Sequence, residues 1–491
     1  MLSALKPPTP RQDFTASLVV FLVALPLCVG VAVASGVPAE LGLITGIVGG
    51  LLVGLLPGSS LQVSGPAAGL AVLVHETVGT YGLATLGVIV LAAGLLQLTL
   101  GALRLGRWFR AISVAVVQGM LAGIGLVLIL GQAYSMADAT APGSGPAKLA
   151  GLPALVGETA TDSRALSAFA VGAGTVAVLV LWKKLPGASR LVPAPLVAVA
   201  LATAVVAVFG LPAAKVEVTG LVESVRLIGL GDFAELANVA LLGTVLAFTL
   251  IASAESLFSA AAVDRLHNGP RTHFDKELMA QGVGNTVCGL LGALPMTAVI
   301  VRSAANVEAG ARTKASRVLH GAWLLLFAAL LPAALGVIPV AALAGVLVHA
   351  GCKLVPVREL APLWREHRGE AVVLTATALA ILVTNMFEGV LIGLLLAVVK
   401  TAWETSRVHT EITEETDVTV VSLSGNATFL RLPHILDTLE TLPRDRAVEL
   451  DLSGLRHLDH ACRTALTNWA ARHPAQGIDP VRTREPAAAS R

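Results

Sequence analysis

The chain has 491 residues, of which 55% are hydrophobic and only 13% are charged, and its formal net charge at pH 7 is +2. A soluble protein carries about 25% charged residues, so this composition excludes an ordinary soluble domain, and the charge balance gives no sign of a nucleic-acid partner. Apolar runs of about 18 residues or more, the length of a helix that crosses a bilayer, recur from Ser17 to Val399. The sequence therefore predicts a polytopic membrane protein.

The N-terminal segment, residues 1–14, has no apolar core. We therefore expect no cleaved signal peptide, and we expect the first long apolar run to be the first membrane segment. The four cysteines show neither CxxC nor CxxxH spacing. The sequence predicts neither a metal site nor a disulfide framework.

Fourteen membrane segments are predicted between residues 15 and 405. In chain order they fall at 15–35, 38–56, 65–79, 83–103, 109–132, 166–182, 192–210, 237–260, 276–293, 297–310, 317–334, 336–351, 370–386 and 388–405. The third and the tenth are too short to cross a membrane alone, and each is third in its half of seven segments. Such a matching pair is typical of transporters built from inverted repeats, with the binding site between the two short segments.

Positive charges are distributed unevenly among the predicted loops. Five loops that would face the cytoplasm hold 16 Lys and Arg residues, whereas the two long loops on the other side, 133–165 and 211–236, hold 4. Cytoplasmic loops are enriched in Lys and Arg. We therefore predict a multi-pass protein of the cell membrane (inner or plasma membrane) with both termini in the cytoplasm.

Four glycines at i+4 spacing, Gly42, Gly46, Gly50 and Gly54, lie on one face of the second predicted segment. Small residues allow neighbouring helix backbones to approach closely inside a bilayer. We interpret this stripe as a packing surface without chemistry.

The stretch LQVSGPAAGLAVLV, residues 61–74, interrupts the apolar sequence at the third segment. We interpret Ser64 as the N-cap of a helix that has a proline in its first turn. The free amides of Ala67, Ala68 and Gly69 would then point into the protein interior. A helix N-terminus carries about half a positive elementary charge, so the pattern predicts an anion site.

A second break, GALPMTAVIVRSAANVEAGART at residues 292–313, repeats the pattern of a proline followed by a short apolar run. This run contains Arg302, and a buried arginine at the bilayer centre costs ~3 kcal/mol or more unless it is paired or lines a site. Two helix N-termini and one arginine would make an electropositive pocket. The two breaks together strengthen the prediction of an anion site.

Four long stretches of the membrane region also occur in the order and spacing of a known family: ALPLCVGVAVASGVPAELGLITGIVGG (24–50), QVSGPAAG (62–69), AESLFSAAAVDRLHNGPRTHFDKELMAQGVGNTVCGLLGALP (254–295) and RSAANVEAGART (302–313). They resemble the SulP family of anion transporters, and the similarity is greatest to bacterial members considered bicarbonate or sulfate transporters. The resemblance implies an all-α membrane domain over residues 15–405, built as a seven-plus-seven inverted repeat with a core and a gate. It also implies elevator-like movement of the core, a homodimer, and a carbonic anhydrase as a candidate partner.

The resemblance places the substrate between the third and tenth segments and implies a set of site residues. They come from the first segment, from the starts of the two short segments, from the eighth segment and from the arginine after the second break. In chain order these residues are Pro26, Leu27, Ala67, Ala68, Gly69, Glu255, Ala298, Val299, Ile300 and Arg302.

Glu255 lies in an apolar run that has no other charged residue. The commonest use of an isolated carboxyl inside a membrane is proton coupling, and Ser259, one turn later, can add a polar contact. The structural alternative is a carboxyl tied to Arg302 or to backbone amides. We therefore predict coupling to H⁺ through Glu255, or uncoupled exchange, with no cofactor.

Sodium coupling is not expected. In sodium-coupled members of the family, as we align them, a hydroxyl residue stands at the position of Ile300 and a threonine at that of Ala67. Neither residue of this chain offers a side-chain oxygen to Na⁺. The anion would be held mainly by backbone amides and helix dipoles.

Two further polar pairs lie on predicted membrane segments. His75 and Glu76 end the third segment, and we expect them to face the outer vestibule, with a proton relay as the minor alternative. Gln281 and Asn285 are four residues apart on the ninth segment. We predict that these two amides form hydrogen bonds between helices.

Residues 411–473 alternate between strands, at 417–423 and 446–452, and amphipathic helices, at 431–442 and 460–473. This segment resembles a STAS domain. It lacks a serine or threonine at the position phosphorylated in related soluble regulators, and no clear final strand and helix follow Arg472. We expect a truncated domain with a regulatory or dimer-supporting role, followed by a disordered tail at residues 474–491.

The leading hypothesis is a secondary active transporter of an inorganic anion, bicarbonate or sulfate. A dicarboxylate or nucleobase proton symporter of the same fold is the near alternative, although a nucleobase permease would carry a second carboxyl near LPMTAVIV. The alternative of a different class is a membrane sensor that signals through its STAS-like tail. No nucleophile–base set, metal-ligand spacing or phosphate-binding loop indicates an enzyme.

Overall fold

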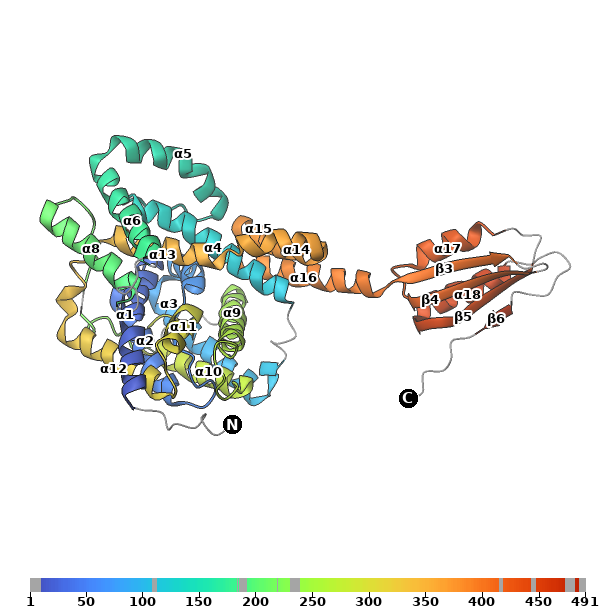
Figure 1. Ribbon diagram of the computed structural model, residues 1–491, viewed down its shortest axis with the longest axis horizontal. Helices are drawn as coiled ribbons and strands as arrows, with labels where there is room; N and C mark the ends of the chain where they lie inside the picture. The colour runs from blue at the N-terminus through green and yellow to red at the C-terminus, as the bar shows by residue number, and fades with distance from the viewer. Residues whose placement is uncertain are drawn as a thin grey trace. The chain divides into compact units, whose positions relative to one another are not determined.

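The computed structural model describes residues 10–107, 113–182, 184, 192–218, 220–229, 239–414, 418–442, 447–472 and 482–484. The chain divides into two compact units, Met1–Leu394 and Leu395–Arg491. The first consists mainly of helices, and the second is a small α/β domain that follows the end of a long helix (Figure 1).

The helices of the first unit follow the predicted membrane segments. Their bounds are α1 (Pro10–Ala34), α2 (Ala39–Val48) with its π-helical continuation η1 (Gly49–Val53), α3 (Ala68–Ala102), α4 (Val114–Met136), α5 (Gly145–Thr161), α6 (Ser163–Trp182), α8 (Ala194–Phe209), α9 (Val239–Val263), α10 (Phe274–Leu290), α11 (Ile300–Glu308), α12 (Ala315–Leu330), the 3₁₀ turn η4 (Pro332–Ala334), α13 (Val340–Leu354), α14 (Val357–Glu366), α15 (Arg368–Val383) and α16 (Met386–Thr405), which continues into the second unit.

Seven of the described helical stretches are long and apolar enough to cross a membrane, and three shorter ones are also apolar. Each of the fourteen predicted segments overlaps a helix, while the number of spans and the inverted repeat stay predictions. The third and fourth segments form two helical stretches of α3 that meet at a kink at Gly82, whose backbone is not helical (φ +83°). Two helices, α5 and α14, lie inside stretches that we predicted as loops.

The helices of the first unit form two groups by their contacts. In one group α3 packs against α9 and α10, and α12 packs against α1 and α2. In the other, α4 packs against α13 and α15, and α6 packs against α8 and α13. The groups meet where α1 contacts α13 and where α3 contacts α4. Figure 1 shows α5, α6 and α8 together on the upper side of this unit and α9, α10 and α11 on the lower side.

The glycine stripe of the second segment packs as predicted. A β-carbon on Gly42 would collide with the carbonyl oxygen of Cys28 in α1. One on Gly50 would lie 2.5 Å from the Cα of Gly321 in α12. Because both obstacles are backbone atoms, no side-chain adjustment relieves them, and the prediction of a packing surface is confirmed.

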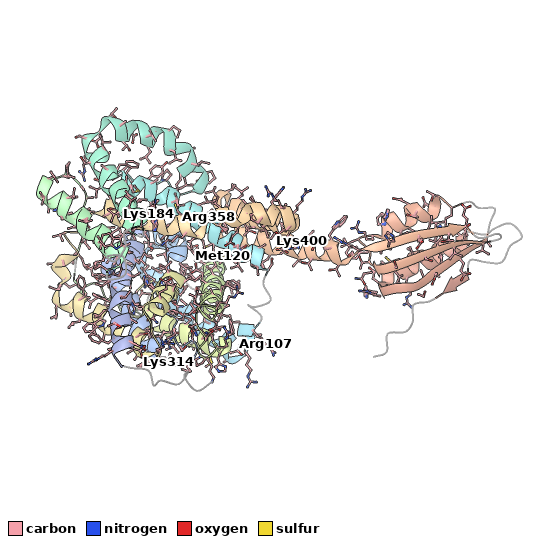
Figure 2. The ribbon with its side chains drawn as sticks, viewed as in Figure 1. Arg107, Met120, Lys184, Lys314, Arg358 and Lys400 are labelled. Carbon is pink, nitrogen blue, oxygen red and sulfur yellow. The ribbon has the colours of Figure 1, made fainter. Side chains whose placement is uncertain are left out.

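The beginning of α12 is fixed to the turn that follows η1. Lys314, labelled in Figure 2, donates from Nζ to the carbonyl oxygen of Leu56 at 2.8 Å. The buried Arg317 donates to the carbonyl oxygens of Gly54 (2.9 Å), Leu56 (3.1 Å) and Gln62 (3.3 Å). All these acceptors belong to the backbone, so Arg317 has a structural role.

The second unit contains a four-stranded sheet in the order β3-β4-β5-β6. β3 (Val408–Glu414) and β4 (Val418–Ala427) are antiparallel, whereas β5 (Ala447–Leu458) is parallel to β4 and to β6 (Arg482–Arg484). The helices α17 (Leu432–Glu440) and α18 (His460–Arg472) supply apolar side chains to its core.

The predicted strands and helices of this domain are confirmed, but the absence of a final strand is wrong, because β6 pairs with β5. Its sequence, Arg-Thr-Arg, has no apolar alternation, so pattern reasoning could not find it. The remainder of the predicted disordered tail, at residues 474–491, lies outside the described residues.

Asp459 joins the start of α18 to the turn after β4. Its carboxylate accepts hydrogen bonds from the backbone N–H groups of Cys462 (2.7 Å) and Phe429 (2.6 Å). Burial acts to raise the pKa of Asp459, but the N–H donors outweigh it, so the pKa lies below its ordinary value. The fold therefore favours the ionised carboxylate.

Asp459→Ala is expected to destabilise this corner of the domain by about 1 kcal/mol, the typical cost of a lost N-cap. Amide hydrogen exchange of the full chain should become faster in residues 427–432 and 460–466. In the wild type the protection should fall as the pH drops below about 4, since protonation removes the favoured form. Asp437→Ala, an exposed change on α17, is the control; equal effects of the two variants would contradict this assignment.

Candidate functional site

The two sequence breaks meet in a pair of short strands inside the first unit. β1 (Ser64–Pro66) pairs antiparallel with β2 (Met296–Ala298), so that Gly65 lies opposite Thr297. α3 begins directly after β1 and α11 directly after β2. Because the strands run in opposite directions, the two helices begin at opposite ends of the pair.

The helices begin slightly later than the sequence predicts. Ser64 is not an N-cap: it lies in β1, and its hydroxyl accepts a hydrogen bond from Gln281 Nε2 at 2.7 Å. The N-cap residue of α3 is Ala67 and that of α11 is Val299, and neither has a side-chain cap. Pairing with β2 holds the residues before Ala67 extended, which moves the helix start by three residues.

The amides at the two helix starts are not equally available. The Ala298 N–H donates to Ser256 Oγ (3.2 Å), and the Val299 N–H donates to the carbonyl oxygen of Val63 (2.9 Å). These two predicted donors are therefore used within the protein. The first amides inside each helix have no intrahelical acceptor, so Ala68 and Gly69 in α3 and Ile300 in α11 are the candidate donors to a ligand. The positive ends of both helix dipoles add to them.

Glu255 stands beside the start of α3. It lies on α9, which contacts α3, β2 and α11. A β-carbon on Gly69 would collide with Glu255 Oε1, so only glycine allows this approach. The Thr297 side chain lies beside the carboxyl, whereas Oε2 is buried without a hydrogen-bond partner among the described residues.

Arg302 lies behind the strand pair and is 1% exposed. Its Nη2 donates to the carbonyl oxygen of Pro66 at 3.3 Å, while Nε and Nη1 have no hydrogen-bond partner among the described residues. A β-carbon on Gly65 would collide with Nη1. No ion pair within the described residues joins Arg302 to Glu255, so the alternative of a carboxyl tied to this arginine is not observed. The site therefore carries a buried positive charge that no carboxylate neutralises directly.

Amide side chains hold the two strands in place. Asn285 accepts from the Met296 N–H (2.7 Å) and donates to the Met296 carbonyl oxygen (3.1 Å) and to Gln97 Oε1 (2.8 Å). Gln281 donates to Ser64 and to Glu277 Oε1. These bonds join α10 to α3 and to both strands. The prediction of hydrogen bonds between helices is confirmed for Asn285, whereas Gln281 bonds to strand β1 and to its own helix.

Three hydroxyl residues at the site escaped the sequence analysis. Ser256 accepts from Ala298 and Thr297 contacts Glu255, as described above, and Ser303 accepts from the Val63 N–H at 2.9 Å. Ser259, which we did predict, is 4% exposed. The closeness of Ser256 to Glu255 in the sequence is the one signal that could have indicated its role.

The first segment closes one side of this region. α1 contains Pro26 within its length, followed by Leu27, and both are buried. The helix contacts α3, α11 and β1. The structure thus brings every predicted site residue onto the elements that surround the strand pair, and it leaves the alkyl side chains of Ala67, Ala68 and Ala298 as small apolar walls. Such a site can hold a dehydrated anion through backbone amides.

The chain is similar in sequence to known membrane transport proteins. The sequence profile of the Sulfate permease family matches residues 11–377, and that of the Mlab STAS domain matches residues 410–488. The "Putative sulfate transporter YvdB" of Bacillus subtilis is 26% identical over 473 residues, which cover 93% of this chain and 88% of that protein. The "Bicarbonate transporter BicA" of Picosynechococcus sp. is 28% identical over 367 residues, covering 70% of this chain and 62% of that protein.

Two solved structures share the fold. The transmembrane domain of a cyanobacterium bicarbonate transporter, BicA, superposes with a TM-score of 0.67 at 23% identity, over 80% of this chain and 98% of that one. Murine Slc26a9, an anion transporter in the inward-facing state, gives a TM-score of 0.76 at 14% identity, over 98% of this chain and 86% of that one. At these identities the structural similarity establishes the fold but does not identify the substrate.

Proposed function

This chain belongs to the sulfate permease family and carries a STAS domain, and on this basis we propose that it is a secondary active transporter of an inorganic anion, bicarbonate or sulfate. The observation that carries the proposal is the strand pair β1–β2, from which two helices without side-chain N-caps begin beside the guanidinium of Arg302, which makes no ion pair among the described residues. Proton coupling or exchange drives the transport.

The anion binds to backbone donors more than to side chains. The amides of Ala68, Gly69 and Ile300 and the two helix dipoles supply partial positive charge, and Arg302 supplies a full charge from behind the strands. Ion–dipole attraction is strong where water is excluded. The small side chains around the amides leave room for the anion and set its size limit.

Alternating access proceeds by an elevator-type movement. The hydrogen bonds of Asn285 and Gln281 connect α10 to α3 and to the strand pair, and α9 packs against α3, β2 and α11, so these elements move as one body. The group of α4, α6, α13 and α15 forms the static part, and the bodies slide where α3 contacts α4. A homodimer and an adjacent carbonic anhydrase remain expectations from the resemblance.

Uptake into proteoliposomes tests the proposal. Purified protein is reconstituted, and uptake of labelled bicarbonate, sulfate and fumarate is followed with an inward proton gradient, an inward sodium gradient or neither. We expect uptake of bicarbonate or sulfate that a proton gradient or internal anion accelerates. Fumarate uptake would favour the dicarboxylate alternative, sodium-driven uptake would overturn the coupling, and uptake of none of the three would favour the sensor hypothesis.

Gly69→Val is expected to lower the initial rate of anion uptake at least tenfold. The new side chain has no room, since even its β-carbon meets Glu255 and lies 3.3 Å from Ile124 Cδ1, and overpacking of this kind costs about 1–3 kcal/mol. Gly79→Val on the same helix is the matched control, because a β-carbon there meets nothing within 4 Å. Equal uptake by both variants in folded protein would remove Gly69 from the site.

A further inference from the structure

Two cavities follow one another on one side of the strand pair, between α3, α4 and α5. The inner cavity, of about 20 Å³, is lined by Gly69 at the start of α3. The outer cavity, of about 190 Å³, is lined by Gln132 and Ser135 of α4. Glu76 and Lys148 line both cavities and therefore stand at the junction between them.

The two cavities differ in what they can hold. A water molecule occupies about 30 Å³ in the liquid, so the outer cavity has room for an anion with part of its hydration shell. The inner cavity has room for about one water. In this conformation an anion from the outer cavity would stop at the junction, next to Glu76 and Lys148, before it reached Gly69.

Lys148 is buried although it lies on a short helix outside the predicted membrane segments. Its residue exposure is 5%, and its carbonyl oxygen accepts a hydrogen bond from the hydroxyl of Tyr134 at 2.7 Å, which fixes α5 to the end of α4. Burial lowers the pKa of Lys148, and the charge of Glu76 acts in the opposite direction. Within the described residues no direct ion pair joins the two side chains.

The charged groups around the junction have unequal consequences for an arriving anion. Lys148 attracts it, Glu76 repels it, and the one other titratable side chain on the described lining of the outer cavity is His75. A buried lysine without a direct carboxylate partner is expensive to keep charged. An anion in the outer cavity would supply the missing partner.

We propose that Lys148 and Glu76 form an anion-admission site, in which Lys148 captures the anion at the junction of the two cavities and Glu76 limits how tightly it is held. The inference rests on the proposed function, since it concerns the path to the same site. The charge distribution among the loops assigns the 133–165 loop, and with it Lys148, to the non-cytoplasmic face. Lys148 is a specificity-determining residue for anions that enter from that face.

Three substitutions separate this role from a structural one. Lys148→Gln is expected to raise the half-saturating concentration of anion about tenfold, because it removes the lysine charge that attracts the anion to the junction and leaves Glu76, which repels it. Lys148→Arg should restore it. Glu76→Gln should lower the half-saturating concentration, which is the opposite of the effect of Lys148→Gln. A general loss of folding cannot produce such a decrease.

The measurement compares the two faces of the membrane. Uptake of labelled sulfate and bicarbonate is measured over a range of concentrations in intact cells, which present the non-cytoplasmic face, and in inverted membrane vesicles. Lys148→Gln should change the half-saturating concentration in cells and leave it unchanged in inverted vesicles. Lys215→Gln is the matched control, an exposed lysine in the other long loop assigned to the same face.

The outcomes are distinct. Equal changes on both faces, or changes in the same direction for Lys148→Gln and Glu76→Gln, would overturn the admission site while the transport proposal stood. An effect of Lys215→Gln as large as that of Lys148→Gln would reduce the role to general surface charge and overturn it too. Failure of the wild type to move either anion from either face would overturn the proposed function and this inference with it.

Discussion

Arg302→Gln is expected to reduce anion transport about 100-fold without unfolding the protein. The guanidinium is the full positive charge behind the strand pair, and interactions with charged groups are worth about 1.5–3 kcal/mol when water is excluded, so kcat/KM should fall by one to two powers of ten. In the part of the chain that the structure describes, its Nε and Nη1 have no hydrogen-bond partner. Removal of a buried, incompletely bonded charge relieves a desolvation cost, so the thermal stability of the anion-free protein should stay equal or rise.

The measurement joins transport to ligand-dependent stability. Saturating sulfate or bicarbonate should raise the Tm of the wild type, since a ligand stabilises the state that binds it, and this rise should vanish in Arg302→Gln. Arg302→Lys should keep part of both effects. Arg317→Gln is the matched control: this buried arginine is bonded to three backbone carbonyls, so its loss should lower stability and spare the anion response. Undiminished transport by Arg302→Gln would remove the arginine from the site.

The positions of the helices were predictable because each depends on a local property of the sequence. Apolar runs of sufficient length located the membrane segments, and the shortness of two of them located the breaks. The stripe from Gly42 to Gly54 predicted tight packing, and the nearest neighbours of Gly42 and Gly50 are backbone atoms of α1 and α12. α5 was not predicted, because it is short and only partly apolar and therefore does not have the pattern of a helix that crosses a membrane.

The start of α3 was misplaced because the competing interaction is remote in sequence. Ser64 is a residue type that commonly caps helices. Its hydroxyl, however, accepts a hydrogen bond from Gln281, 217 residues away, and its backbone in β1 pairs with Ala298 in β2. No window of sequence contains that pairing. For the same reason the amides of Ala298 and Val299 were counted as ligand donors, although Ser256 and Val63 already accept from them.

The charged members of the candidate site were predictable, whereas its neutral hydroxyls were not. Glu255 and Arg302 are conspicuous because a charge inside an apolar run is costly. Thr297 and Ser303 are common residue types with no such signal, and their roles depend on neighbours remote in sequence, Glu255 for Thr297 and Val63 for Ser303. From the sequence, Lys148 entered only the count of positive charges in the 133–165 loop. Its burial near Glu76 depends on how α5 packs against α4.

Glu255→Gln is expected to abolish proton-driven accumulation while anion exchange continues. An ionised carboxylate beside Gly69 repels an anion at the start of α3, whereas the neutral acid does not, so the entry of anion and proton is linked at this residue. Glutamine resembles the neutral acid in shape and keeps an oxygen near Thr297. The variant should therefore bind anion at every pH, exchange it across the membrane, and lose the acceleration by an inward proton gradient.

Glu277→Gln provides the matched control for this prediction. Glu277 is also a buried carboxylate, 1% exposed, but both of its oxygens are hydrogen-bonded, Oε1 to Gln281 and Oε2 to the Ser59 N–H at 2.7 Å. Its substitution should lower stability and leave the proton dependence of uptake intact. Accumulation against a concentration gradient by Glu255→Gln, measured in proteoliposomes with an inward proton gradient, would show that the coupling proton binds elsewhere. We expect Glu255→Gln to lose this accumulation. Among the described residues of the site, Oε2 of Glu255 is the one buried carboxyl oxygen without a hydrogen-bond partner, and it can accept a proton.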